Sequence, residues 1–156
     1  MHRFILLAAV VAVAGCSRTP TSATATFEPK SGSQITGTAT FDEANGSTTI
    51  AISAKALSPG KHGVAVHEKG DCSGSNAAAV GNRFQPAGDH DAGLLGEIEA
   101  GADGTGTLKV TSSKMTVAPG DRSVIGKSIV ISGDPANPGS LTTFGIISCG
   151  VIEAAK

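Results

Sequence analysis

Short stretches in which apolar and polar residues alternate follow one another along most of the chain, with turn-forming residues between them. The side chains of a β-strand point to its two faces in turn, so this period of two residues predicts strands. The predicted strands cover residues 23–29, 34–42, 47–57, 62–69, 97–100, 105–110, 128–131 and 144–149. The sequence shows no helical period and no internal repeat. Strands at this density predict an all-β sandwich or barrel.

Three of the connections between predicted strands have residues that suit tight hairpin turns. Lys30-Ser31-Gly32-Ser33, Asn45-Gly46 and Asp103-Gly104 each supply a residue that tolerates a positive φ angle. Hairpin turns require such residues because their backbone twist must match that of the strands they join. The sequence therefore predicts antiparallel hairpins at these positions.

The beginning of the chain predicts export. A short basic start at residues 1–3 is followed by residues 4–14 without a charged side chain. This pattern is typical of a signal peptide and is too short to span a bilayer as a helix. The run ends in Val13-Ala14-Gly15-Cys16, which resembles a lipobox, where small residues admit a peptidase and the cysteine thiol receives lipid. We expect residues 1–15 to be a lipoprotein signal peptide and Cys16 to be the lipidated residue. The alternative is an ordinary cleaved signal with a chance cysteine.

The expected anchor also predicts a location. Residues 16–22 form a polar, lipidated tether, and residues 23–156 form a single domain of ordinary size. Ser17 follows Cys16, and in lipoproteins of Gram-negative bacteria a residue other than aspartate at this position implies sorting to the outer membrane. We expect a protein of the bacterial cell envelope that is held in the membrane by its lipid and faces the periplasm.

Composition narrows the class further. The chain has five Phe, no Trp and no Tyr, while Gly is abundant, and this mixture suits short strands joined by tight turns. The formal net charge is −1 and the basic residues form no stripe. Nucleic acid is therefore excluded as a partner.

Cysteine usage agrees with export. Assigning Cys16 to lipid leaves Cys72 and Cys149 as an even pair in an oxidising compartment, which predicts one disulfide bond. A closed loop of this length stabilises a fold by about 4 kcal/mol in the loop-entropy account. The alternative, a free-thiol or metal-binding role, is less favoured because neither cysteine belongs to a short Cys-Cys or Cys-His spacing.

A series of ordered motifs resembles the copper/zinc superoxide dismutase family. The family carries a His-Gly-x-His-x-His-Glu-x-Gly-Asp-Cys stretch, and this chain has His62-Gly63-Val64-Ala65-Val66-His67-Glu68-Lys69-Gly70-Asp71-Cys72. The other matching segments are Gly81-Asn82-Arg83-Phe84-Gln85-Pro86, Asp91-Ala92-Gly93-Leu94-Leu95-Gly96, the stretch 123–131 and Cys149-Gly150-Val151-Ile152. The resemblance extends over roughly residues 23 to 153 and implies an eight-stranded Greek-key β-barrel.

The resemblance also shows that most of the family's functional positions have changed. Of its copper-binding histidines, those expected at Ala65, Arg83 and Ser132 are missing and only His67 remains. The two zinc ligands of the family's His-x-Gly-Asp motif align with Asp91 and Leu94. The arginine that guides superoxide in the family aligns with Ile146. We call Ala65, Arg83, Leu94, Ser132 and Ile146 the vacated positions.

This pattern predicts a loss of the family's chemistry. Dismutation needs a copper ion that several imidazoles hold in both oxidation states. Arginine stays cationic and has no lone pair to donate to a metal. We therefore expect no cofactor and a non-enzymatic lipoprotein that serves as a platform for an envelope protein. The sequence does not rank this platform against a second function, the binding of a small ligand in the vacated cleft. The alternative is a metal-binding protein or weak dismutase in which His67, His90 and Asp91 hold copper or zinc weakly.

Other polar residues have structural explanations. His62 resembles a family histidine that ties strands together, and a hydrogen bond at the surface would account for His67. Glu97 and Glu99 share a strand face and fit exposed positions, and a solvated loop explains residues 89–91. No nucleophilic triad and no phosphate-binding glycine loop stands out in the sequence.

Overall fold

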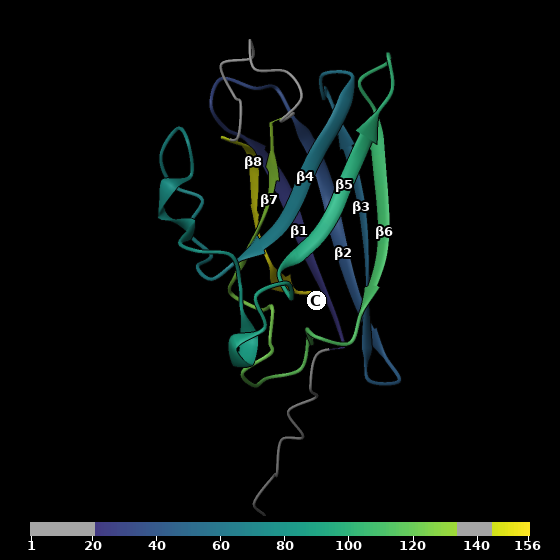
Figure 1. Cartoon of the computed structure of the whole chain (residues 1–156), viewed down its shortest axis with the longest axis vertical. Helices are drawn as coiled ribbons and strands as arrows, with labels where there is room; N and C mark the ends of the chain where they lie inside the picture. The colour runs from purple at the N-terminus through teal and green to yellow at the C-terminus, as the bar shows by residue number, and fades with distance from the viewer. Residues whose placement is uncertain (1–20, 134–144) are drawn as a thin grey trace, which may run out of the picture.

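The computed structural model describes residues 21–133 and 145–156, which form an antiparallel β-barrel (Figure 1). Its main strands are β1 (Ser22–Pro29), β2 (Thr36–Ala44), β3 (Ser47–Lys55), β4 (Gly60–His67), β5 (Leu94–Ala100), β6 (Gly106–Ser112), β7 (Ser128–Ser132) and β8 (Ile146–Val151). Neighbours are hydrogen-bonded in the order β5-β4-β7-β8-β1-β2-β3-β6, and the short β9 (Glu153–Ala154) pairs with β1. The barrel is nearly but not fully closed, because β5 and β6, the two ends of this order, are not hydrogen-bonded to each other. The all-β prediction is confirmed.

Several element boundaries differ from the predicted ones. β5 begins at Leu94, ahead of the predicted start at residue 97, and β7 extends to Ser132. The described part of β8 begins at Ile146, and its predicted start at residue 144 lies outside the described residues. The described residues also contain two single-turn 3₁₀ helices that the sequence pattern did not predict, η1 (Ala78–Val80) and η2 (Pro86–Gly88). Elements this short carry no recognisable period.

The predicted leader and anchor lie outside the described residues. These are the signal peptide at residues 1–15, the lipidated Cys16 and most of the tether at residues 16–22, of which only Thr21 and Ser22 are described. β1 already begins at Ser22. In the described ranges, no helix is both long enough and apolar enough to cross a membrane.

The predicted turns adopt the backbone geometry that their residues allow. Asn45 and Gly46 have φ angles of 52° and 75° between β2 and β3, and Gly104 has a φ angle of 73° between β5 and β6. Between β1 and β2, Ser31 and Gly32 have φ angles of 53° and 77°. These predictions are confirmed.

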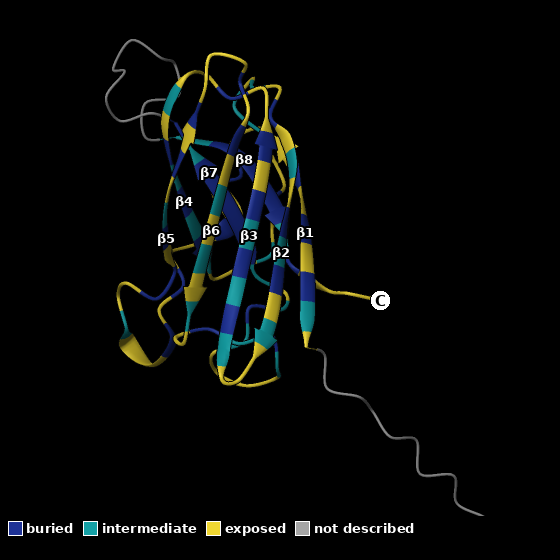
Figure 2. Ribbon diagram, turned by 90° about the vertical axis from the view of Figure 1, so that its right-hand side faces the viewer, coloured by how far each residue is buried: buried dark blue, intermediate teal, exposed yellow. Residues whose placement is uncertain are grey.

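The main core fills the barrel interior, and along strands such as β3 buried residues alternate with more exposed ones (Figure 2). Val64 and Val66 point inward from β4, as predicted from the two-residue period. The largest fully buried side chains include Phe27, Phe41 and Ile98. With few aromatic residues available, β-branched side chains fill most of the remaining volume, which suits their preference for strands.

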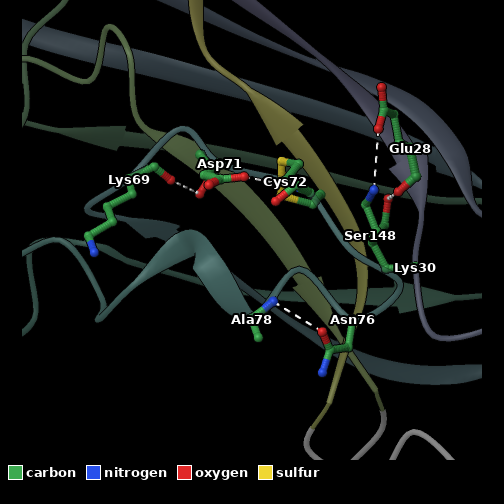
Figure 3. Close-up of a disulfide and its surroundings, with 11 residues drawn as sticks. Glu28, Lys30, Lys69, Asp71, Cys72, Asn76, Ala78 and Ser148 are labelled. Carbon is green, nitrogen blue, oxygen red and sulfur yellow. Dashed lines mark hydrogen bonds and ion pairs between the residues drawn. A yellow bond between two sulfur atoms is a disulfide. The ribbon is translucent and has the colours of Figure 1, made fainter.

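A second, smaller cluster lies outside the barrel, between the outer face of β7 and β8 and the long segment that joins β4 to β5. It contains Cys72, Ala77, Val80, Val130 and Cys149. Cys72 and Cys149 form the predicted disulfide bond, with their Cα atoms 5.7 Å apart (Figure 3). The bond ties the β4–β5 segment to β8. This segment carries several of the site residues, so the disulfide helps to hold them against the barrel.

Candidate functional site

The outer face of β4 forms the floor of a pocket. Gly63, Ala65 and His67 lie on this face and are half-buried, while the alternate residues are in the core. The pocket has a volume of about 490 Å³. It is lined by Gly63, Val64, Ala65, His67, Gly81, Asn82, Arg83, Leu94, Ser132 and Ile146. We call it the His67 pocket.

All of the vacated positions line this one pocket. Their side chains come from four strands and from the β4–β5 segment, and they line the same pocket as the remaining histidine. The residues concerned are Ala65 on β4, Arg83 in the segment, Leu94 on β5, Ser132 on β7 and Ile146 on β8. The pocket therefore corresponds to the place where the resemblance puts a metal centre.

Arg83 is the direct cross-strand neighbour of His67. The two residues form an antiparallel bridge, flanked by hydrogen bonds from Phe84 N to Val66 O at 2.8 Å and from Glu68 N to Asn82 O at 3.0 Å. This pattern makes them a non-hydrogen-bonded pair, the arrangement in which facing side chains are closest. A permanent positive charge therefore lies beside the imidazole.

Gly93 allows the segment that carries Arg83 to approach the barrel closely. A Cβ atom at this position would lie 2.7 Å from the backbone oxygens of both Val66 and Phe84, and 2.9 Å from Arg83 Cγ. Side chains do not tolerate such distances, so only glycine fits here. The stem of Arg83 packs over this glycine, which fixes where the side chain leaves the backbone.

The hydrogen bond of His67 determines which ring nitrogen is free. Its Nδ1 atom lies 2.9 Å from the carbonyl oxygen of Gly81. A carbonyl oxygen only accepts, so Nδ1 carries the hydrogen, and Nε2 holds the lone pair of the neutral ring. Sequence reasoning expected a hydrogen bond at His67 but did not identify Gly81, because a backbone acceptor leaves no mark in the sequence.

Two irregularities in strand pairing frame the pocket. The register between β4 and β5 shifts between Val64 and Ala65, and the register between β7 and β8 shifts between Ile131 and Ser132. Such β-bulges turn side chains out of their regular direction and are frequent beside functional sites. Here they adjoin two vacated positions, Ala65 and Ser132.

His90 and Asp91, the other residues of the predicted metal site, lie elsewhere. Both are exposed in a turn where Asp91 N donates to Asp89 Oδ1 at 3.1 Å, and neither lines the His67 pocket. Within residues 21–133 and 145–156, no three His, Cys, Asp or Glu side chains lie together in a way that could hold a metal ion. His67, His90 and Asp91 thus do not form the remodelled site that the sequence suggested.

The neighbouring Asp89 holds this turn in place through its side-chain contacts. Its carboxylate pairs with Lys114 Nζ at 3.0 Å and accepts from the backbone of Asp91. The hydrogen bond from Lys114, followed by those from the backbone, lowers the pKa of Asp89 below its ordinary value. Asp89 is therefore occupied in anchoring the turn to the segment after β6.

The remaining polar candidates have structural contacts. His62 is buried, with Nε2 at 2.8 Å from Ser58 O and Nδ1 at 3.3 Å from Ser132 O, so it ties β4 to neighbouring segments. Glu97 pairs with Lys61 at 3.4 Å across β4 and β5, and both side chains are largely exposed. Glu99 is exposed as well. These residues show no catalytic arrangement.

The donors in the His67 pocket do not fit a copper or zinc centre. Among the described lining residues, His67 Nε2 is the one imidazole nitrogen available, and Ala65 offers no donor atom. Both metals need several nitrogen, sulfur or carboxylate ligands in a defined geometry. Arg83 adds a fixed cation where a metal cation would sit. The chemistry that this set supports is the binding of an anion or a polar group.

Comparison with known families agrees with the fold. Residues 35–152 match the family model described as copper/zinc superoxide dismutase. The match extends from the start of β2 to the residue between β8 and β9, and so contains the β4 motif and the disulfide. The barrel is of the copper/zinc superoxide dismutase type, as the motifs in the sequence implied. The chain belongs to the copper/zinc superoxide dismutase family.

Proposed function

We propose that this chain is a non-enzymatic member of its family, an envelope lipoprotein whose disulfide-locked barrel binds another molecule instead of dismutating superoxide. The observation that carries the proposal is the pairing of His67 with Arg83 inside the pocket that the vacated positions line. The cation stands where the family has an imidazole that contacts both metals.

The chemistry of dismutation supports this proposal. A redox-active copper ion must be held in two oxidation states by several soft or borderline donors, with one position open. Ala65 and Ser132 supply no imidazole, and Ile146 supplies no positive guide for superoxide. Several metal ligands and the guiding arginine are missing at once. Restoring any single position therefore leaves the site without the other groups that dismutation needs.

The proposed location follows from the sequence. A lipid on Cys16 would hold the protein on a membrane, and Ser17 favours the outer membrane, with the barrel in the periplasm. The oxidising periplasm suits the Cys72–Cys149 disulfide. A partner would thus be an envelope protein or a small molecule in that compartment, and no cofactor is needed.

The competing function is a metal-binding protein or weak dismutase centred on His67, whose Nε2 is free to ligate. The two functions are separated by equilibrating the purified full-length protein with copper and zinc, then measuring bound metal and superoxide dismutation. His67→Gln, which keeps size and polarity but removes the imidazole, is the matched control.

We expect less than one tightly bound copper ion per chain and dismutation no faster than that of the His67→Gln protein. Stoichiometric copper together with rapid dismutation that His67→Gln abolishes would overturn the proposal.

A further inference from the structure

The His67 pocket combines a fixed positive charge with an apolar wall. Among the described residues that line it, Arg83 is the one with a permanent charge, and none of them is a carboxylate. Leu94, at 50% exposure, is the large hydrophobic side chain that the described ranges leave exposed. Ala65 and Ile146 continue the apolar lining beside it. A site of this composition suits a ligand that is both anionic and partly apolar.

From this composition we propose that the pocket binds a small organic carboxylate, with the carboxylate against Arg83 and a short apolar tail against Leu94. The proposal rests on the function proposed above and names the ligand class of that same site. A volume of about 490 Å³ is within the range of small-molecule sites. It is larger than a bare inorganic anion would need.

Among the described residues, the guanidinium of Arg83 has no ion-pair partner. The ion pairs between described residues join Lys30 to Glu28, Lys61 to Glu97 and Lys114 to Asp89, and none of them uses Arg83. A guanidinium presents two parallel N–H donors that match the two oxygens of a carboxylate. The packing of Arg83 Cγ over Gly93 restricts the stem, so less side-chain freedom is lost on binding.

Two further polar groups line the pocket. Ser132 carries a hydroxyl that can donate to a carboxylate oxygen, and its backbone is held by the contact with His62. The Nε2 side of His67 is directed away from its bond to Gly81 and can exchange a hydrogen bond with the ligand. Arg83 and His67 face each other at one end of the pocket, and Ser132 lies beside Gly63 at the other. Leu94 is paired with Ala65 between these two polar ends.

The test is a titration of the purified full-length protein, followed by ¹H–¹⁵N NMR. The probes are benzoate and hexanoate, with benzamide as the uncharged analogue and inorganic phosphate as an anion without a tail. We expect saturable shifts of the Ala65, His67, Ser132 and Ile146 amides with both carboxylates. Benzamide and phosphate are expected to bind at least tenfold more weakly.

Variants distinguish this site from surface binding. Arg83→Gln is expected to weaken the binding of benzoate at least tenfold. Leu94→Thr is expected to weaken the binding of hexanoate more than that of acetate, which is added as a carboxylate without a long tail. Arg122→Gln is the matched control, because Arg122 lies in another loop, where it donates to Ser113 O at 2.8 Å, and it is expected to leave binding unchanged. Neither variant removes the disulfide. An NMR spectrum with the dispersion of the unmodified protein shows that each variant is folded.

Absence of saturable shifts with both carboxylates, or equal affinity in the Arg83→Gln protein, would overturn the inference. Its failure differs from that of the proposed function. A flat titration in a protein without dismutase activity rejects only the carboxylate, whereas stoichiometric copper with rapid dismutation rejects the non-enzymatic function itself.

Discussion

At the scale of single residues, Asp103 shows how a side chain fixes a turn and its own charge. Its carboxylate accepts hydrogen bonds from Thr105 Oγ1 at 2.8 Å and from Thr105 N at 3.1 Å, closing the turn between β5 and β6. The side-chain hydrogen bond is the larger cause that lowers the pKa of Asp103, and the backbone hydrogen bond is the next.

Thr105→Val is therefore expected to raise the pKa of Asp103 toward its ordinary value, because the hydroxyl donor is lost while the backbone donor remains. A native pKa below the unfolded value stabilises the fold above the unfolded pKa, and this contribution is lost as the pH falls through the native pKa. NMR titration of the Asp103 carboxyl carbon measures the change. Thr105→Ser, which keeps the hydroxyl, should retain the low pKa, and an unchanged pKa in Thr105→Val would contradict the assignment.

The sequence was least informative about the tertiary contacts of single residues. The alternation of β4 predicted that Val64 and Val66 face inward, and they do. By contrast, nothing local predicted that Gly81 would accept from His67, or that Gly93 would lie against the stem of Arg83. Those contacts depend on how the β4–β5 segment folds back on β4, which is a tertiary feature.

At the scale of elements, one carboxylate holds the long connection between β6 and β7. Glu43, on β2, accepts hydrogen bonds at a single oxygen from Val117 N at 2.7 Å and from Ala118 N at 2.9 Å. Thr48 Oγ1 donates to Met115 O at 2.9 Å in the same connection. These contacts join the connection to β2 and β3, and its Met115 and Val117 are fully buried.

Glu43→Ala is expected to lower the free energy of unfolding by about 2 kcal/mol, since two charge-assisted hydrogen bonds are lost and their donors are left without the carboxylate. Glu43→Gln keeps an acceptor and should lose less. Asp42→Asn, at an exposed position of the same strand, is the control, with an expected change of about 0.5 kcal/mol or less. Denaturant unfolding gives the energies, and faster exchange of the Val117 and Ala118 amides shows where the loss occurs.

The disulfide acts on a larger element, the β4–β5 segment. Replacing Cys72 and Cys149 together by alanine is expected to lower the free energy of unfolding by about 4 kcal/mol, because the cross-link closes a long loop in the unfolded chain. Reduction of the native protein should lower its melting temperature as well. An equal melting temperature for the native and the double-alanine protein would show that the bond contributes nothing.

The predicted element boundaries are wrong where the strand pairing is irregular. The bulge between Val64 and Ala65 lets β5 pair as far as Leu94, through Gly96, whose φ angle of 118° suits few other residues. A glycine inside an apolar stretch looks like a turn in the sequence, so the predicted strand began later. Regular hairpins such as β2–β3, with Asn45-Gly46 at the turn, were predicted correctly.

At the scale of the whole molecule, the fold brings distant positions together around one pocket. Ala65, Arg83, Leu94, Ser132 and Ile146 are far apart in sequence, and their spacing alone predicts no common site. Only the resemblance to a family suggested that they belong together. The barrel topology, which places β5, β4, β7 and β8 side by side, gives the physical reason.

This grouping makes a prediction about partial restoration of the metal site. Ala65→His returns one imidazole to β4 beside His67, but Arg83 and Ser132 still occupy the other copper positions. We therefore expect dismutation by this variant to stay at the level of the unmodified protein after loading with copper and zinc. Ala65→Ser is the control for a polar side chain of small size, and dismutation well above both proteins would contradict the prediction.

The account depends on whether the pocket can hold a redox ion at all. The most direct measurement is a crystal structure of the full-length protein grown with excess copper, with anomalous scattering recorded at the copper edge. We predict no fully occupied copper ion beside His67. A fully occupied ion at His67 Nε2, coordinated by at least three protein atoms, would contradict the account.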